Sequence, residues 1–191
     1  MIPFYLPLEP RYTRPPSLCS ELIVDTLETL DDLKVINEVT ESHINVDICY
    51  NYYLARTVGR KEVIEDFRWN CYYGYLAIAK WLHRTYQISK DEAKMDNNWA
   101  FRSACENGHL NVAKWLKRSF QISNDEAKIW NNCAFQLACY NGHLNVAKWL
   151  HRTFQISNDE AKTDNNWAFR YACENSHTLV SNWLKETFDC E

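Results

Sequence analysis

Apolar and polar positions recur along the last two thirds of the chain at a fixed interval of 34 residues. Each interval holds two stretches in which apolar residues follow the three-and-four spacing of an α-helix. In a representative unit this spacing predicts a first helix over 98–107 and a second over 110–120. The residues expected to turn inward are Phe101, Ala104 and Cys105 in the first helix, and Leu110, Ala113 and Leu116 in the second, with Val112 and Trp115 flanking them.

The segments between these stretches carry turn and capping signals. Gly108 follows the first helix, where glycine adopts a left-handed turn at least cost. Ser123 and Glu126 have the spacing of a capping box, and the same pair recurs one unit before and one unit after. We therefore expect a short third helix near 124–129 in each unit, and no strand in the repeated region.

The period itself predicts the architecture. An interval of this length is typical of a stack of helical units, each of which buries its apolar face against its neighbours. All five prolines fall between residues 3 and 16, which predicts an extended segment over 1–19. Helical spacing begins near Ser20 and predicts a helical segment over 20–62, either a cap or a decayed repeat. The expected fold is an all-α helical solenoid of about four units over 63–191, with a helical N-terminal capping segment.

The charge pattern and the positions of the cysteines limit which classes of function the chain can have. The net charge is −4 with both signs interspersed, so no basic stripe for nucleic acid is expected. No apolar run is long enough for a membrane span, and no secretory signal is recognisable, so we expect an intracellular, cytoplasmic protein. Four of the eight cysteines occupy equivalent positions in successive units. Packed helices lie about 8–10 Å apart, beyond the roughly 7 Å that a disulfide spans, so we expect free thiols.

Candidate catalytic and metal-binding groups are weak. Cys105 and His109 are four residues apart, and the pair recurs in the two units that follow. Zinc needs four ligands whereas each unit offers two, so we expect no metal and no cofactor. No cysteine has an evident base and orienting group, and four glycines are too few for a phosphate-binding loop. We expect no enzyme.

The stretch AFRSACENGHLNVAKWL, which begins at Ala100, resembles the core of an ankyrin repeat. Ala104-Cys105 stands where that family has Ala-Ala, and Gly108-His109-Leu110 stands at its turn. The resemblance extends from about residue 64 to the end. Trp99-Ala-Phe-Arg102 replaces the usual Thr-Pro-Leu-His, and FQISNDEAK replaces the usual sequence of the hairpin loop between repeats. With these departures the repeats resemble the divergent ankyrin repeats of large DNA viruses. Tetratricopeptide repeats share the 34-residue period, but a proline usually closes their unit and this array has none.

The resemblance implies a module that binds another protein in a concave groove, lined by the loop before each first helix and by the end of that helix. The resemblance places Ile129, Trp130 and Tyr140 in this groove, flanked by Asp96, Glu106, Asp164 and Glu174. Together with inner-helix positions that differ between nearly identical units, these are the predicted partner-binding residues: Asp96, Arg102, Glu106, Ile129, Trp130, Gln136, Leu137, Tyr140, Asp164, Arg170, Tyr171 and Glu174. Aromatic side chains ringed by charge are typical of interface hot spots. The alternative is neutral drift after duplication, with Cys133 in place of Trp99 as a repacking of the core. The interface interpretation is favoured for Trp130 and Tyr140.

A second hypothesis concerns the N-terminal segment. Residues 20–33 resemble the start of an F-box, with Leu22, Leu27 and Leu30 at its apolar positions, although the spacing after Leu30 is about two residues short. This resemblance implies a substrate adaptor that contacts a ubiquitin-ligase scaffold. The expected partner is therefore another protein, bound by a monomer.

Overall fold

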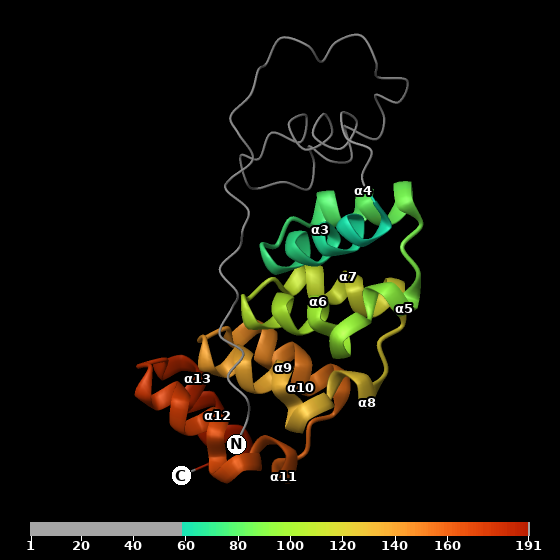
Figure 1. The fold of residues 1–191 in the computed structure, drawn as a ribbon. Helices are drawn as coiled ribbons and strands as arrows, with labels where there is room; N and C mark the ends of the chain where they lie inside the picture. Colours follow the sequence, from blue (N-terminus) through green and yellow to red (C-terminus); the bar gives the residue numbers. More distant parts are fainter. Residues whose placement is uncertain (1–58, 191) are drawn as a thin grey trace, which may run out of the picture. The chain divides into compact units, whose positions relative to one another are not determined.

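The computed structural model describes residues 59–190 (Figure 1). The predicted extended segment 1–19, the F-box-like stretch 20–33 and nearly all of segment 20–62 lie outside the described residues. Within 59–190 every regular element is a helix, and no strand occurs. In chain order the helices are α3 (Arg60–Tyr72), α4 (Leu76–Tyr86), α5 (Lys90–Ala93), α6 (Met95–Glu106), α7 (Leu110–Phe120), α8 (Asn124–Ala127), α9 (Ile129–Tyr140), α10 (Leu144–Phe154), α11 (Asn158–Ala161), α12 (Thr163–Glu174) and α13 (Thr178–Phe188).

The helices form two layers. The inner helices α3, α6, α9 and α12 pack against one another in chain order, and the outer helices α4, α7, α10 and α13 each pack on the inner helix of the same repeat (Figure 1). The short helices α5, α8 and α11 connect one repeat to the next. This arrangement confirms the predicted all-α helical solenoid. None of the helices in 59–190 has the length and apolar character required to cross a membrane.

The core follows the repeated apolar positions, with one correction. Phe101, Ala104 and Cys105 are fully buried, as the spacing predicts. In α7, however, the buried residues are Val112, Ala113, Leu116 and Phe120, whereas Leu110 is only half-buried. Val112 and Leu116 lie four residues apart on one side of α7, and that side, rather than the side through Leu110, meets the inner helices.

The beginning of each inner helix differs from the prediction. Asp96, Asn97 and Asn98 have φ angles of 53°, 55° and 58°, so three successive residues adopt the left-handed conformation before a right-handed helix continues from Trp99. Asparagine and aspartate are the non-glycine residues that tolerate this conformation best. The third helix also ends earlier than predicted, at Ala127 instead of residue 129, because Lys128 leaves the helical conformation with φ −92° and ψ 7°.

A histidine joins each repeat to the one before it. The predicted left-handed glycine is confirmed at Gly108, whose φ is 78°. A β-carbon placed on Gly108 would lie 2.6 Å from Nδ1 of His143 in the next repeat, so this imidazole packs directly on the glycine. The His143 ring also hydrogen-bonds the main chain of Glu106. These histidines therefore bridge repeats rather than serving only their own turn.

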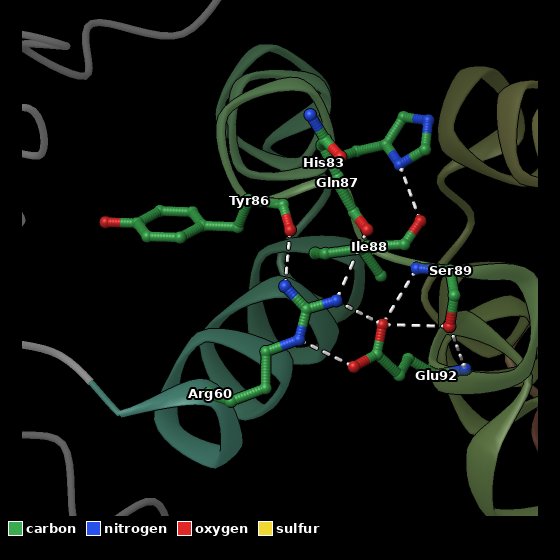
Figure 2. Close-up of polar contacts among 7 residues, drawn as sticks. All are labelled: Arg60, His83, Tyr86, Gln87, Ile88, Ser89 and Glu92. Carbon is green, nitrogen blue, oxygen red and sulfur yellow. Dashed lines mark hydrogen bonds and ion pairs between the residues drawn. The ribbon is translucent and has the colours of Figure 1, made fainter.

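Capping glutamates make a second set of links between repeats. The three predicted capping boxes are confirmed, each with a serine and a glutamate that satisfy one another's main-chain N–H group. Glu92 also accepts hydrogen bonds from the guanidinium of Arg60, which lies in the preceding repeat (Figure 2). Lys94 binds Glu126 and Lys128 binds Glu160 in the same way, each at 2.8 Å. One carboxylate thus caps a helix and ties two repeats together.

Candidate interaction surface

The predicted partner-binding residues all lie on consecutive inner helices. Asp96, Arg102 and Glu106 belong to α6, the residues from Ile129 to Tyr140 belong to α9, and those from Asp164 to Glu174 belong to α12. Because these three helices pack side by side, the twelve residues belong to one part of the molecule. We use the name inner-helix surface for these twelve residues together with the side chains of α3, α6, α9 and α12 that lie beside them.

Polar contacts between adjacent inner helices follow a fixed register. Arg68 on α3 forms an ion pair with Asp96 on α6, at 2.6 Å. At the corresponding place one repeat later, the guanidinium of Arg102 lies 4.3 Å from the centre of the Trp130 ring. Trp130 occupies the position of Asp96, so a cation–π contact replaces an ion pair at this junction.

Trp130 is held firmly although much of it is open to solvent. Its exposed fraction is 53%. The Arg102 guanidinium that lies over the ring is itself fixed, because Nε donates to the Asn97 carbonyl at 2.9 Å and Nη2 donates to that of Asp96 at 3.1 Å. The indole is therefore a prepositioned aromatic group near the middle of the inner-helix surface.

Several of the predicted residues are less accessible than Trp130, among them Gln136, Ile129 and Leu137. Gln136 is only 3% exposed. Its amide donates to the Thr163 hydroxyl at 3.1 Å and to the Asp164 carboxylate at 3.5 Å. Gln136 therefore orients Asp164 from beneath the surface. Ile129 and Leu137 are half-buried.

Tyr140 is part of an aromatic cluster across the α9–α12 junction. Its ring stacks on Trp167, with centroids 5.6 Å apart and an interplanar angle of 23°. Tyr171 lies 5.7 Å from Tyr140 and 4.5 Å from Trp167. The guanidinium of Arg170 lies 5.8 Å from the Tyr171 ring. We call Tyr140, Trp167 and Tyr171 the C-terminal aromatic cluster.

A larger aromatic cluster at the α3–α6 junction is absent from the sequence-based prediction. Tyr72 stacks on Trp99 at 6.0 Å and 11°, and Trp69 contacts both rings at 5.4 Å. Tyr73 packs on Tyr72 at 5.0 Å. We call Trp69, Tyr72, Tyr73 and Trp99 the N-terminal aromatic cluster. A signal was present in the sequence, because Tyr72 and Tyr140 are equivalent residues two units apart, but the prediction compared only the later units.

Glu106 lies between the two clusters. It is the equivalent of Tyr72 and Tyr140 in the intervening repeat, and it is half-buried. Desolvation raises the pKa of its carboxyl, and the nearby charge of Arg102 partly offsets this effect. Across the junction its neighbour is Cys133, which stands where the flanking repeats have Trp99 and Trp167.

The cysteines of the core are packing groups. Cys71, Cys105 and Cys139 are buried free thiols, and burial raises the pKa of each one well above its ordinary value. A high thiol pKa disfavours the thiolate that nucleophilic catalysis and zinc binding require. Within the described range, no group of three or more His, Cys, Asp or Glu side chains is placed to hold a metal ion.

The stacked helix pairs, left-handed glycine turns and inter-repeat histidines define a helical-repeat protein of the solenoid type. A family model described as "Ankyrin repeats (3 copies)" matches residues 68–157 and 101–191, and the chain belongs to the ankyrin repeat family. Among solved structures, an ankyrin repeat family protein from Legionella pneumophila is similar, with 25% sequence identity and a TM-score of 0.54. The match covers 83% of this chain and 50% of that one, so this chain spans about half the length of its structural relative. No curated protein matches the sequence.

Proposed function

We propose that the repeats bind a partner protein on the inner-helix surface, with Trp130 and Tyr140 as the central anchors. Ankyrin repeats are generally protein-interaction modules, which makes this the natural class of function. The observation that supports this location of the binding site is the exposure of Trp130. Its large aromatic side chain is more than half exposed and is nevertheless held by Arg102. A rigid, exposed ring gains contact area on binding at little cost in conformational entropy.

The remaining predicted residues have defined places in this proposal. Asp96, Asp164 and Glu174 supply exposed carboxylates around the anchors, and Arg170 and Tyr171 extend the C-terminal aromatic cluster. Docking is rigid, because the anchors are tied to their neighbours before the partner arrives. The partner binds to a monomer, so a single chain carries the whole surface.

The repeats themselves provide variants that should retain the fold. Trp130→Asp introduces the residue found at the equivalent positions 96 and 164, and Tyr140→Glu introduces the residue found at 106 and 174. We propose a pull-down with the full chain, in which the wild type is compared with this double variant. Arg118→Ala with Arg152→Ala is the matched control, because both arginines are exposed on outer helices.

The expected result is a partner that the wild type and the outer-helix control capture and the double variant loses. Once that partner is purified, each anchor substitution should weaken its affinity about 30-fold, as expected for a hot-spot residue. Circular dichroism should show equal helix content in all three proteins. Capture by the double variant at the level of the wild type would refute the inner-helix surface as the binding site.

The adaptor hypothesis rests on residues 20–33, which lie outside the described residues. It predicts that substitution of Leu22, Leu27 and Leu30 abolishes binding to a ligase scaffold while the repeats still capture their partner. The resemblance of the repeats to those of large DNA viruses likewise stays a prediction from the sequence. The structurally similar protein comes from a bacterium.

A further inference from the structure

Glu106 is a half-buried carboxylate without a hydrogen bond or an ion pair to any residue in 59–190. The capping glutamates Glu92, Glu126 and Glu160 are also half-buried, but each of them binds a lysine or arginine. The charge of Arg102, one helical turn before Glu106, acts on this carboxyl. The Arg102 guanidinium is directed elsewhere, to the Asn97 carbonyl, to the Trp130 ring and, through Nη1, to the Cys133 sulfur at 3.9 Å. A desolvated charge without a partner costs stability, so this site is unfavourable for the isolated protein.

The surroundings of Glu106 differ from the flanking junctions by a paired change. At the junction before it, Tyr72 stacks on Trp99, and at the junction after it, Tyr140 stacks on Trp167. At the middle junction the tyrosine is replaced by a carboxylate and the tryptophan by the small Cys133. The middle junction therefore holds a carboxylate and less side-chain volume, with an aromatic pair in the repeat junction on each side.

We propose that this position receives an arginine side chain of the partner protein, with the guanidinium paired to Glu106 and bordered by the rings of Tyr72 and Tyr140. This inference rests on the proposed function and specifies the chemistry of its partner. A cationic group on the partner complements this carboxylate, because the arginines on α3 and α6 already bind other groups. Arg68 binds Asp96, and Arg102 is fixed as described above.

The surface itself shows why arginine fits better than lysine. The Arg68 guanidinium lies 4.9 Å from the centre of the Trp99 ring, and the Arg102 guanidinium lies 4.3 Å from that of Trp130. A planar guanidinium can stack on a ring and at the same time donate two parallel hydrogen bonds to a carboxylate. An ammonium group is a point charge and cannot satisfy both geometries equally well.

The test is a selection of random 16-residue peptides, displayed on phage, against the full-length chain. Parallel selections use wild type, Glu106→Gln, Glu186→Gln and the Trp130→Asp, Tyr140→Glu double variant. Glu186→Gln is the matched control because Glu186 is an exposed glutamate on the outer helix α13, outside the inner-helix surface. A peptide selected by the wild type is then synthesised with arginine, with lysine and with uncharged citrulline, and each affinity is measured by fluorescence anisotropy.

Arginine should be enriched in peptides selected by the wild type and by Glu186→Gln, and not in those selected by Glu106→Gln. Replacement of the arginine by citrulline should weaken binding to the wild type about tenfold or more, and binding to Glu106→Gln should hardly change. Equal affinity of the lysine peptide, or arginine enrichment that survives Glu106→Gln, would overturn the inference. Peptides that bind the double variant as well as the wild type would instead refute the proposed function.

Thermal unfolding separates a binding role from a structural one. If Glu106 serves recognition, Glu106→Gln should leave the melting temperature unchanged or raise it, because the substitution removes an unpaired, half-buried charge. A lower melting temperature together with lost peptide binding would show that the residue supports the fold, and would overturn the inference.

Discussion

Backbone conformation at single residues determines where each repeat changes direction. Asp96, Asn97 and Asn98 form a left-handed turn that only a few residue types tolerate, and the polar side chain of Asn98 is turned inward. Its amide donates to the Glu126 carbonyl at 3.3 Å. Trp130 adopts the same conformation with φ 52°, although an indole gains none of the local hydrogen bonding that favours asparagine there. A bulky residue in this conformation implies that something other than stability retains it.

Replacement of the glycine at the turn should be costly. Gly108→Ala places a methyl group in the left-handed region and within 2.6 Å of the His143 ring. We expect a loss of about 2–3 kcal/mol in the free energy of unfolding, since strain and steric overlap add. Urea denaturation would measure it. Gly59→Ala is the control, because a β-carbon there meets no atom within 4 Å and should cost less than about 1 kcal/mol.

The inter-repeat histidines should make stability fall on mild acidification. Desolvation is the largest cause that lowers the pKa of His109 and His143, and the charge of the next histidine in the row adds to it. In the unfolded chain a histidine titrates at about 6.5. Below that value the unfolded state binds more protons than the folded state, so the free energy of unfolding decreases as pH falls.

Urea denaturation at pH 7, 6 and 5 would test this pH dependence. The wild type should lose stability steadily over this interval, and a double variant with His109→Gln and His143→Gln should show a flatter profile. The capping glutamates have lowered pKa values, so their protonation belongs below this window. A wild-type profile that rises toward pH 5 would contradict the expected sign.

At the scale of the elements, one carboxylate serves two purposes at each connection. The Glu126 carboxylate accepts from the Ser123 main chain at 2.8 Å and from Lys94 at 2.8 Å. Glu126→Ala should reduce the free energy of unfolding by about 1–2 kcal/mol, because a helix cap and an inter-repeat ion pair are lost together. Asp125→Ala removes an exposed charge from the same helix and should cost less than about 0.5 kcal/mol. Equal losses in the two variants would contradict the dual role of Glu126.

Repeat spacing and capping signals were sufficient to predict the elements. The second helix of the representative unit occupies 110–120 as predicted, and the capping box at Ser123 is confirmed. The spacing could not show that Asp96 and its neighbours are left-handed, because a run of Asn and Asp is compatible with several turns. It also could not show which side chains meet across repeats. Arg68 contacts Asp96 only because helix packing brings the interior of α3 against the start of α6.

On the scale of the whole molecule, stability should be a sum over repeats and their junctions. Deletion of residues 98–131 removes one complete repeat, joins Asn97 to Asn132 and leaves Lys94 facing Glu160. We expect a folded chain with the same helix content per residue, which unfolds cooperatively with about 2–5 kcal/mol less free energy. Circular dichroism and urea denaturation would show this.

A deletion that breaks the register is the control for this experiment. Removal of 98–114 takes away an inner helix and leaves the end of its outer helix without a partner. That variant should lose its cooperative transition. If the whole-repeat deletion behaved in the same way, the nearest-neighbour description of this chain would be wrong.

The fixed sequence spacing of the contacts between repeats affects how the number of repeats can change in the gene. Gln136 meets a residue 28 positions later, and Lys94 meets one 32 positions later, and the same offsets recur at other junctions. A crossover between two misaligned copies of the coding sequence would add or remove 34 residues while each donor still faced a suitable acceptor. Repeat number can therefore change in one genetic event without a new interface having to arise. Under the proposed function, recognition can then diverge by point substitution at positions such as 106 and 130, while the helical framework stays the same.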